Sequence, residues 1–130
     1  MFVNEETVND YKKQGVALLR NVISSDWLEK LAKGIEKNFL DPSKYKCVYE
    51  QENGKEIFYD DYCNWQRIEE YKDFIFNSDI AKIAAQLMQS KKVNLFHEHV
   101  LIKEPGAKKR TPWHQDQPYY CVDGKDNCSL

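Results

Sequence analysis

The most informative stretch of this sequence is Thr111-Pro112-Trp113-His114-Gln115-Asp116-Gln117-Pro118-Tyr119-Tyr120. At its centre an imidazole and a carboxylate stand two positions apart, at His114 and Asp116. In an extended segment, side chains at positions i and i+2 point to the same side, so both can reach one metal ion. Two such ligands and a distant histidine form the facial triad of non-haem Fe(II) oxygenases. A His-x-Asp tripeptide also arises on ordinary polar surfaces, so the surrounding residues must decide.

The surrounding residues give the tripeptide a specific context. An apolar segment, Val100-Leu101-Ile102, runs into Lys103-Glu104-Pro105-Gly106 and a short basic loop before the ligand stretch begins. Over about residues 93–124, this arrangement closely resembles the phytanoyl-CoA dioxygenase (PhyH-like) family of Fe(II)- and 2-oxoglutarate-dependent oxygenases. The resemblance implies that His114 and Asp116 bind Fe(II), with 2-oxoglutarate as cosubstrate. It also implies hydroxylation, because halogenases of this kind replace the carboxylate ligand with a small residue.

The resemblance implies a fold as well. Members of the family form a jelly-roll, or cupin-like double-stranded β-helix, of about eight strands. They carry a second histidine well downstream of His-x-Asp, followed by an arginine that holds 2-oxoglutarate. Here no histidine follows His114 and no arginine follows Arg110. We therefore expect an α+β chain with N-terminal helices and an incomplete double-stranded β-helix. Residues 1–130 would be a single domain, the N-terminal part of an oxygenase domain truncated after the first ligand motif, and inactive by itself.

A second pair of histidines lies upstream, at His97 and His99. On an extended strand both would share a face with Leu101 and Lys103. Either one of them is the third metal ligand or, as the resemblance favours, both line the cavity beside the iron. Lys103 either helps to hold an anionic cosubstrate or is a solvated lysine at a strand end.

Aromatic residues flank the ligand pair. Tyr119 and Tyr120 either face the substrate, since such cavities are apolar with few polar groups, or pack with Trp113 at the mouth of the barrel. The basic run at residues 108–110 is either a solvated turn or a contact for a phosphate of a coenzyme A ester. We expect a small-molecule or acyl-CoA substrate.

Composition limits the remaining possibilities. A hydrophobic fraction of 42% with 13% aromatic residues argues against disorder. The 19 basic and 21 acidic residues nearly balance, which gives no reason to expect nucleic acid or an anionic membrane as partner. No apolar run approaches the roughly 20 residues of a membrane span, and the first residues lack a signal peptide, so we expect a cytoplasmic protein. The four cysteines form no C-x-x-C pair, which favours reduced thiols over a zinc framework.

Local patterns predict four helices and two strand regions. Gly15 is placed to end the first helix, Ser24-Ser25-Asp26 to begin the second with Asp26 and Glu29 as a capping box, and Pro42 to stop it. The expected helices cover residues 5–14, 24–41, 65–76 and 78–89, the last capped by Ser78 or Asp79. The expected strands are residues 16–19 and 93–103, with a hairpin formed by residues 46–49 and 57–59 around Gly54.

Three functions from different classes stay open. The first is an Fe(II)- and 2-oxoglutarate-dependent oxygenase. The second is a non-catalytic metal-binding or scaffold chain, completed by another chain. The third is a cupin-like metalloenzyme that does not use 2-oxoglutarate. A histidine and an arginine downstream of the ligand pair would distinguish the first from the others.

Overall fold

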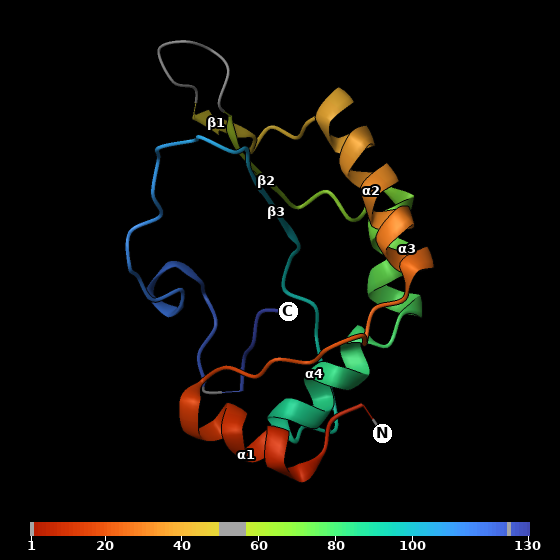
Figure 1. Ribbon diagram of the computed structural model, residues 1–130, viewed down its shortest axis with the longest axis vertical. Helices are drawn as coiled ribbons and strands as arrows, with labels where there is room; N and C mark the ends of the chain where they lie inside the picture. The colour runs from red at the N-terminus through yellow and green to blue at the C-terminus, as the bar shows by residue number, and fades with distance from the viewer. Residues whose placement is uncertain (1, 50–56, 125) are drawn as a thin grey trace.

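The computed structural model describes residues 2–49, 57–124 and 126–130 (Figure 1). These residues form a mixture of helices and a small antiparallel sheet, which confirms the α+β class. No helix in these ranges is both long and apolar enough to cross a bilayer. The elements in chain order are α1 (Glu5–Gln14), α2 (Ser25–Leu40), β1 (Cys47–Tyr49), β2 (Phe58–Tyr62), α3 (Glu69–Asn77), α4 (Ile80–Met88), β3 (His99–Lys103) and the 3-10 turn η1 (Gln117–Tyr119).

The first two helices are bounded by local caps. The Asn4 side chain accepts the Thr7 N–H at 2.8 Å, and Gly15 ends α1 in the left-handed conformation at φ 76°. A side chain there would be strained, so the predicted glycine stop is confirmed. At the start of α2 the Ser24 hydroxyl accepts the Trp27 N–H. The expected capping box on Asp26 was wrong, because the helix already begins at Ser25 and places Asp26 inside its first turn.

The three strands pair antiparallel in the order β1-β2-β3. The predicted hairpin is confirmed by the pairing of Cys47 with Asp60 and of Tyr49 with Phe58. Gly54, expected in its loop, lies outside the described residues. On the other side of β2, the ladder with β3 runs from Phe58 opposite Lys103 to Tyr62 opposite His99.

The two faces of the sheet have different surroundings. Tyr59 and Asp61 of β2 are buried on the first face, where Asn38 of α2 contacts both. Directly opposite residues in an antiparallel ladder share a face, so the register also defines a second face. This second face consists of Cys47, Tyr49, Phe58, Asp60, Tyr62, His99, Leu101 and Lys103.

Residues 16–19 do not form the expected strand. They run extended after α1 but pair with no strand of the sheet among the described residues. Ala17 and Leu19 pack against a core cluster between α1 and α4, whereas Val16 and Leu18 are exposed. The apolar run that suggested a strand therefore packs every second side chain onto the helices instead of pairing with the sheet. The cluster consists of Val3, Val8, Ile83 and Leu87.

The expected strand at residues 93–103 is shorter than predicted and begins at His99. Its ladder stops there because β2 ends at Tyr62 and the next residue, Cys63, turns away with φ 63°. His97 thus precedes the strand. The third helix also starts late, since the Glu98 carboxylate accepts the N–H groups of Asn64 and Trp65 in a turn before α3.

Helices α2 and α3 lie side by side, as Figure 1 shows at its right edge. Gly34 permits the close approach: a Cβ there would lie 2.7 Å from Cε1 of Tyr71. Trp27 packs edge-on against Phe74 with ring centroids 5.7 Å apart. The fourth helix begins at Ile80, whose N–H is accepted by the Ser78 hydroxyl at 3.3 Å, while Asp79 makes no capping bond.

Candidate functional site

The two predicted metal ligands lie side by side. His114 Nε2 is 3.1 Å from Asp116 Oδ1, and both side chains are about half exposed, at 41% and 54%. Two adjacent ligands of an octahedral ion with bonds of about 2.1 Å lie about 3.0 Å apart. The separation therefore fits joint coordination of one ion, and the donor set of an imidazole and a carboxylate suits Fe(II).

The backbone fixes which nitrogen of His114 faces Asp116. Nδ1 lies 2.8 Å from the carbonyl oxygen of Pro112, so Nδ1 carries a proton and donates to it. In the neutral ring the lone pair of Nε2 then points toward the Asp116 carboxylate. Two lone-pair atoms at this distance need a cation between them. A proton can take that place. The hydrogen bond to the Pro112 carbonyl is the largest cause that raises the pKa of His114; desolvation opposes it, and the charge and hydrogen bond of Asp116 raise the pKa further.

The described residues do not bring a third ligand to this pair. No group of three or more His, Cys, Asp or Glu side chains in residues 2–49, 57–124 and 126–130 is placed to hold a metal ion. His99 Nε2 instead contacts Asp60 Oδ1 across the second face of the sheet. His97 packs against Tyr120, with ring centroids 5.3 Å apart. The structure thus brings neither upstream histidine into the His114–Asp116 pair.

Lys103 lies at the end of β3, on the second face as the sequence predicts. Its Nζ stands 6.0 Å from the ring centroid of Phe58. From the basic loop, Lys109 stands over the neighbouring ring of Tyr49 at 4.9 Å. Both ammonium groups thus stand over aromatic rings at the end of the sheet where Tyr49, Phe58 and Lys103 lie opposite one another. Such a cation–π contact contributes about 0.5–1 kcal/mol at exposed positions.

The two tyrosines proposed to face the substrate differ in their surroundings. Tyr119 is 76% exposed and lies near His114, with ring centroids 6.5 Å apart. Tyr120 is half-buried and packs against Phe96 and His97, each at 5.3 Å. Trp113 is fully exposed, so it does not pack against the described part of the chain. Tyr120 therefore ties the ligand segment to the stretch that leads into β3.

A buried polar cluster beneath the sheet was not anticipated from the sequence. Asp61 has no exposed surface, and its carboxylate accepts hydrogen bonds from Ser43, Asn38 and Tyr59. Burial raises the pKa of Asp61, but the bonds from Ser43 and Asn38 outweigh it and lower the pKa to about 2. The signal in the sequence was the pair Asp60-Asp61 inside an aromatic strand, since aspartate is depleted in strands.

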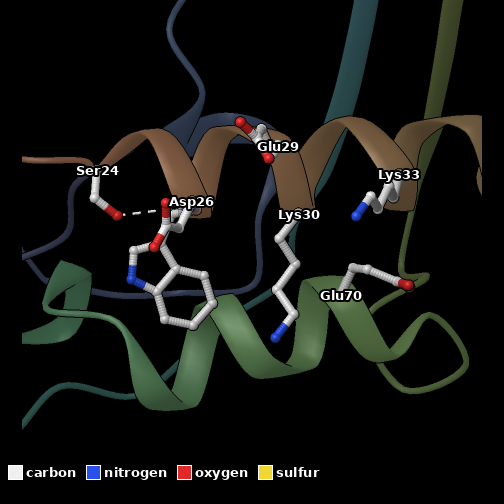
Figure 2. Close-up of a pocket in the computed structure, with 7 residues that line it drawn as sticks. Ser24, Asp26, Glu29, Lys30, Lys33 and Glu70 are labelled. Carbon is white, nitrogen blue, oxygen red and sulfur yellow. Dashed lines mark hydrogen bonds between the residues drawn. The ribbon is translucent and has the colours of Figure 1, made fainter.

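A shallow groove between α2 and α3 lies apart from the ligand pair (Figure 2). Both acidic and basic side chains line it. Lys30 and Glu70 are paired across the two helices with Asp73 and Lys37 respectively. The Lys30 ammonium also stands over the Trp27 ring, 5.2 Å from its centroid. These two ion pairs join α2 to α3, so the groove is part of the interface between the two helices.

Comparison with known proteins identifies the family of the chain. The model of the phytanoyl-CoA dioxygenase (PhyH) family matches residues 11–128, a span that includes β3, His114 and Asp116. The chain belongs to this family. No curated protein and no solved structure matches it.

Proposed function

We propose that the chain is part of an Fe(II)- and 2-oxoglutarate-dependent dioxygenase that hydroxylates a small-molecule or acyl-CoA substrate. The observation that carries this proposal is the 3.1 Å separation of His114 Nε2 and Asp116 Oδ1, which two adjacent ligands of one ion require. Membership of the PhyH family supports it independently. The three-stranded sheet would be one part of the double-stranded β-helix that holds such a site.

Each residue of the pair would have a separate task. Fe(II) with 2-oxoglutarate, when bound, supplies the oxidising chemistry. His114 would bind the ion through Nε2, and its bond to the Pro112 carbonyl fixes the ring and its tautomer. Asp116 would bring a negative charge that partly neutralises the ion. Tyr120 would hold the segment against Phe96 and His97, and Tyr119 would stand on the substrate side of His114.

A second candidate is a non-catalytic metal-binding role. It is favoured by the absence of a third ligand beside the pair among the residues that the structure describes. Both candidates require metal at His114 and Asp116. They differ in turnover, because a site with two ligands leaves ion and cosubstrate loosely placed, and a displacement of about 1 Å already costs about a hundredfold in rate.

Calorimetry with Mn(II), a redox-stable substitute for Fe(II), tests the shared requirement. We expect weak binding by the 130-residue chain and none by a His114→Ala, Asp116→Ala double variant. A variant with Asp123→Asn, an exposed aspartate outside the pair, is the matched control and should bind as the wild type does. Equal binding by the double variant would refute the assignment of both ligands.

A further inference from the structure

Two adjacent aspartates of β2 point to opposite faces of the sheet and have different surroundings. Asp61, on the first face, is fully buried and accepts hydrogen bonds from several partners. The side chain of Asp60, on the second face, has a single hydrogen-bond partner within the described parts of the chain, His99. The buried network therefore accounts for Asp61 and leaves the role of Asp60 open.

The contact between Asp60 and His99 fixes the hydrogen-bonding character of the pair. An ionised carboxylate only accepts, so His99 Nε2 must carry the proton that Asp60 Oδ1 receives. His99 Nδ1 and Asp60 Oδ2 have no hydrogen-bond partner in residues 2–49, 57–124 and 126–130. The two side chains are 34% and 22% exposed. The pair, in its neutral-imidazole form, thus offers two acceptor atoms on partly exposed side chains.

Aromatic rings connect this pair to the ligand segment. The Tyr62 ring lies edge-on to His99 and to His97, with centroids 5.5 and 5.9 Å apart. The His97 ring also packs against Tyr120, which lies four positions after Asp116 in the sequence. The charges of Asp116 and Asp60, after burial, both raise the pKa of Tyr120. The Asp60–His99 pair therefore belongs to the same side of the molecule as the candidate metal ligands.

His97 strengthens the acceptor character of this surface. Burial is the largest cause that lowers the pKa of His97. Its ring is then uncharged at neutral pH and brings no positive charge that could attract an anion. Lys103, on the same face, stands over Phe58, which pairs with it at the far end of the ladder from His99.

We propose that Asp60 and His99 form a substrate subsite that accepts a hydrogen bond from a hydroxyl or a protonated amine and rejects carboxylate and phosphate groups. That the bound molecule is a substrate rests on the proposed function. The subsite would select which part of the substrate is turned toward the sheet. Rejection of anions holds while the His99 imidazole is neutral, because an approaching oxyanion then meets the Asp60 charge and two lone pairs with no donor to compensate them.

Three probes of equal chain length test the proposal: 1-butanol, butylammonium and butyrate. The imidazole carbon-bound proton signals of the 130-residue chain are followed by nuclear magnetic resonance while each probe is added to the same concentration. We expect butylammonium or butanol to shift the His99 signals and butyrate to leave them unchanged. A response to butylammonium alone assigns a cationic group, and a response to both assigns the hydrogen-bond donor itself.

Variants then locate the response. Asp60→Asn should abolish the shift of the His99 signals. Asp73→Asn, which replaces an aspartate of α3 that pairs with Lys30 of α2, should retain the shift. The proposal is overturned if butyrate shifts the His99 signals as much as butylammonium, if no probe does, or if folded Asp60→Asn responds like the wild type. Should Asp60→Asn unfold, the probes on the wild type and on His99→Gln decide, because the glutamine should weaken the response. Mn(II) binding is measured separately on the wild type. If the proposed function is wrong but the subsite exists, metal binding is absent and the His99 signals still respond to the probes.

Discussion

Asn38 of α2 donates a hydrogen bond of 2.7 Å to the carboxylate of Asp61 in β2, and neither residue has any exposed surface. This bond joins the helix layer to the sheet directly beneath Asp60. Tyr71 of α3 extends the connection by donating to the Asn38 side-chain oxygen at 3.2 Å. A buried charge is tolerated only when its lone pairs are satisfied, so this cluster fixes how α2, α3 and β2 meet.

The Asp61 cluster predicts a dependence of stability on pH. The pKa of Asp61 is about 2 in the folded chain, below the value of 3.8 for a free side chain. A carboxyl group with a lowered folded pKa contributes stability above its unfolded pKa and loses it as the pH falls through the folded value. We expect this group to contribute about 2 kcal/mol that disappears between about pH 4 and pH 2.

Urea unfolding at pH 5 and pH 2.5 measures this contribution. Asp61→Asn should lower the free energy of unfolding at pH 5 by about 1–3 kcal/mol and fall less than the wild type between the two pH values. Asp123→Asn serves as control, since this aspartate is exposed. An Asp61→Asn variant with the full wild-type fall in stability would show that other carboxyl groups carry the effect.

The contact between Gly34 and Tyr71 predicts that even a methyl group is too large at position 34. Its Cβ would stand 2.7 Å from Cε1 of Tyr71 and 3.0 Å from Cβ of Glu70. Although alanine favours a helix more than glycine by about 1 kcal/mol, the clash should outweigh this gain. Gly34→Ala should therefore destabilise the chain by about 1–3 kcal/mol. Thermal unfolding tests it, and Ala32→Gly on the same helix, which removes a methyl group without creating a clash, calibrates the propensity term.

Burial predicts opposite outcomes for two large apolar residues. Ile83 is 2% exposed in the cluster between α1 and α4, and Ile83→Ala should cost about 2–5 kcal/mol of unfolding free energy. Trp113 is fully exposed despite its place beside His114. Trp113→Ala should change stability by less than about 0.5 kcal/mol. A large loss of stability on replacing Trp113 would show that the segment packs more closely than its exposure indicates.

Turnover by the 130-residue chain distinguishes a complete site from a partial one. The His114–Asp116 pair has no third ligand beside it in the described ranges. We expect succinate formation from 2-oxoglutarate with Fe(II) and ascorbate to stay at the level of an iron-only control, with and without acyl-CoA substrates. Succinate above that control, abolished by Asp116→Ala, would mean that another group of this chain completes the site.

Features that depend on neighbours in the sequence were predictable. The end of α1 at Gly15 and the end of α2 before Pro42 follow from residues that act within a few positions of the chain, and the pairing of β1 with β2 joins strands close in sequence. The His-x-Asp segment was also recognisable, because its ligand types and spacing are written in consecutive residues. The family match over residues 11–128 confirms the family that this segment indicated.

The tertiary structure decided which extended segments became strands and which polar residues met. Residues 16–19 form an apolar run and residues 93–98 alternate as a strand does, but a strand needs a partner for its hydrogen bonds. Both edges of β2 are already paired, with β1 and with β3. Likewise no spacing in the sequence joins Asp60 to His99 or Asn38 to Asp61. These pairs arise because the sheet register and the packing of α2 bring distant residues together, while the alternation of strand side chains sends two adjacent aspartates to opposite faces.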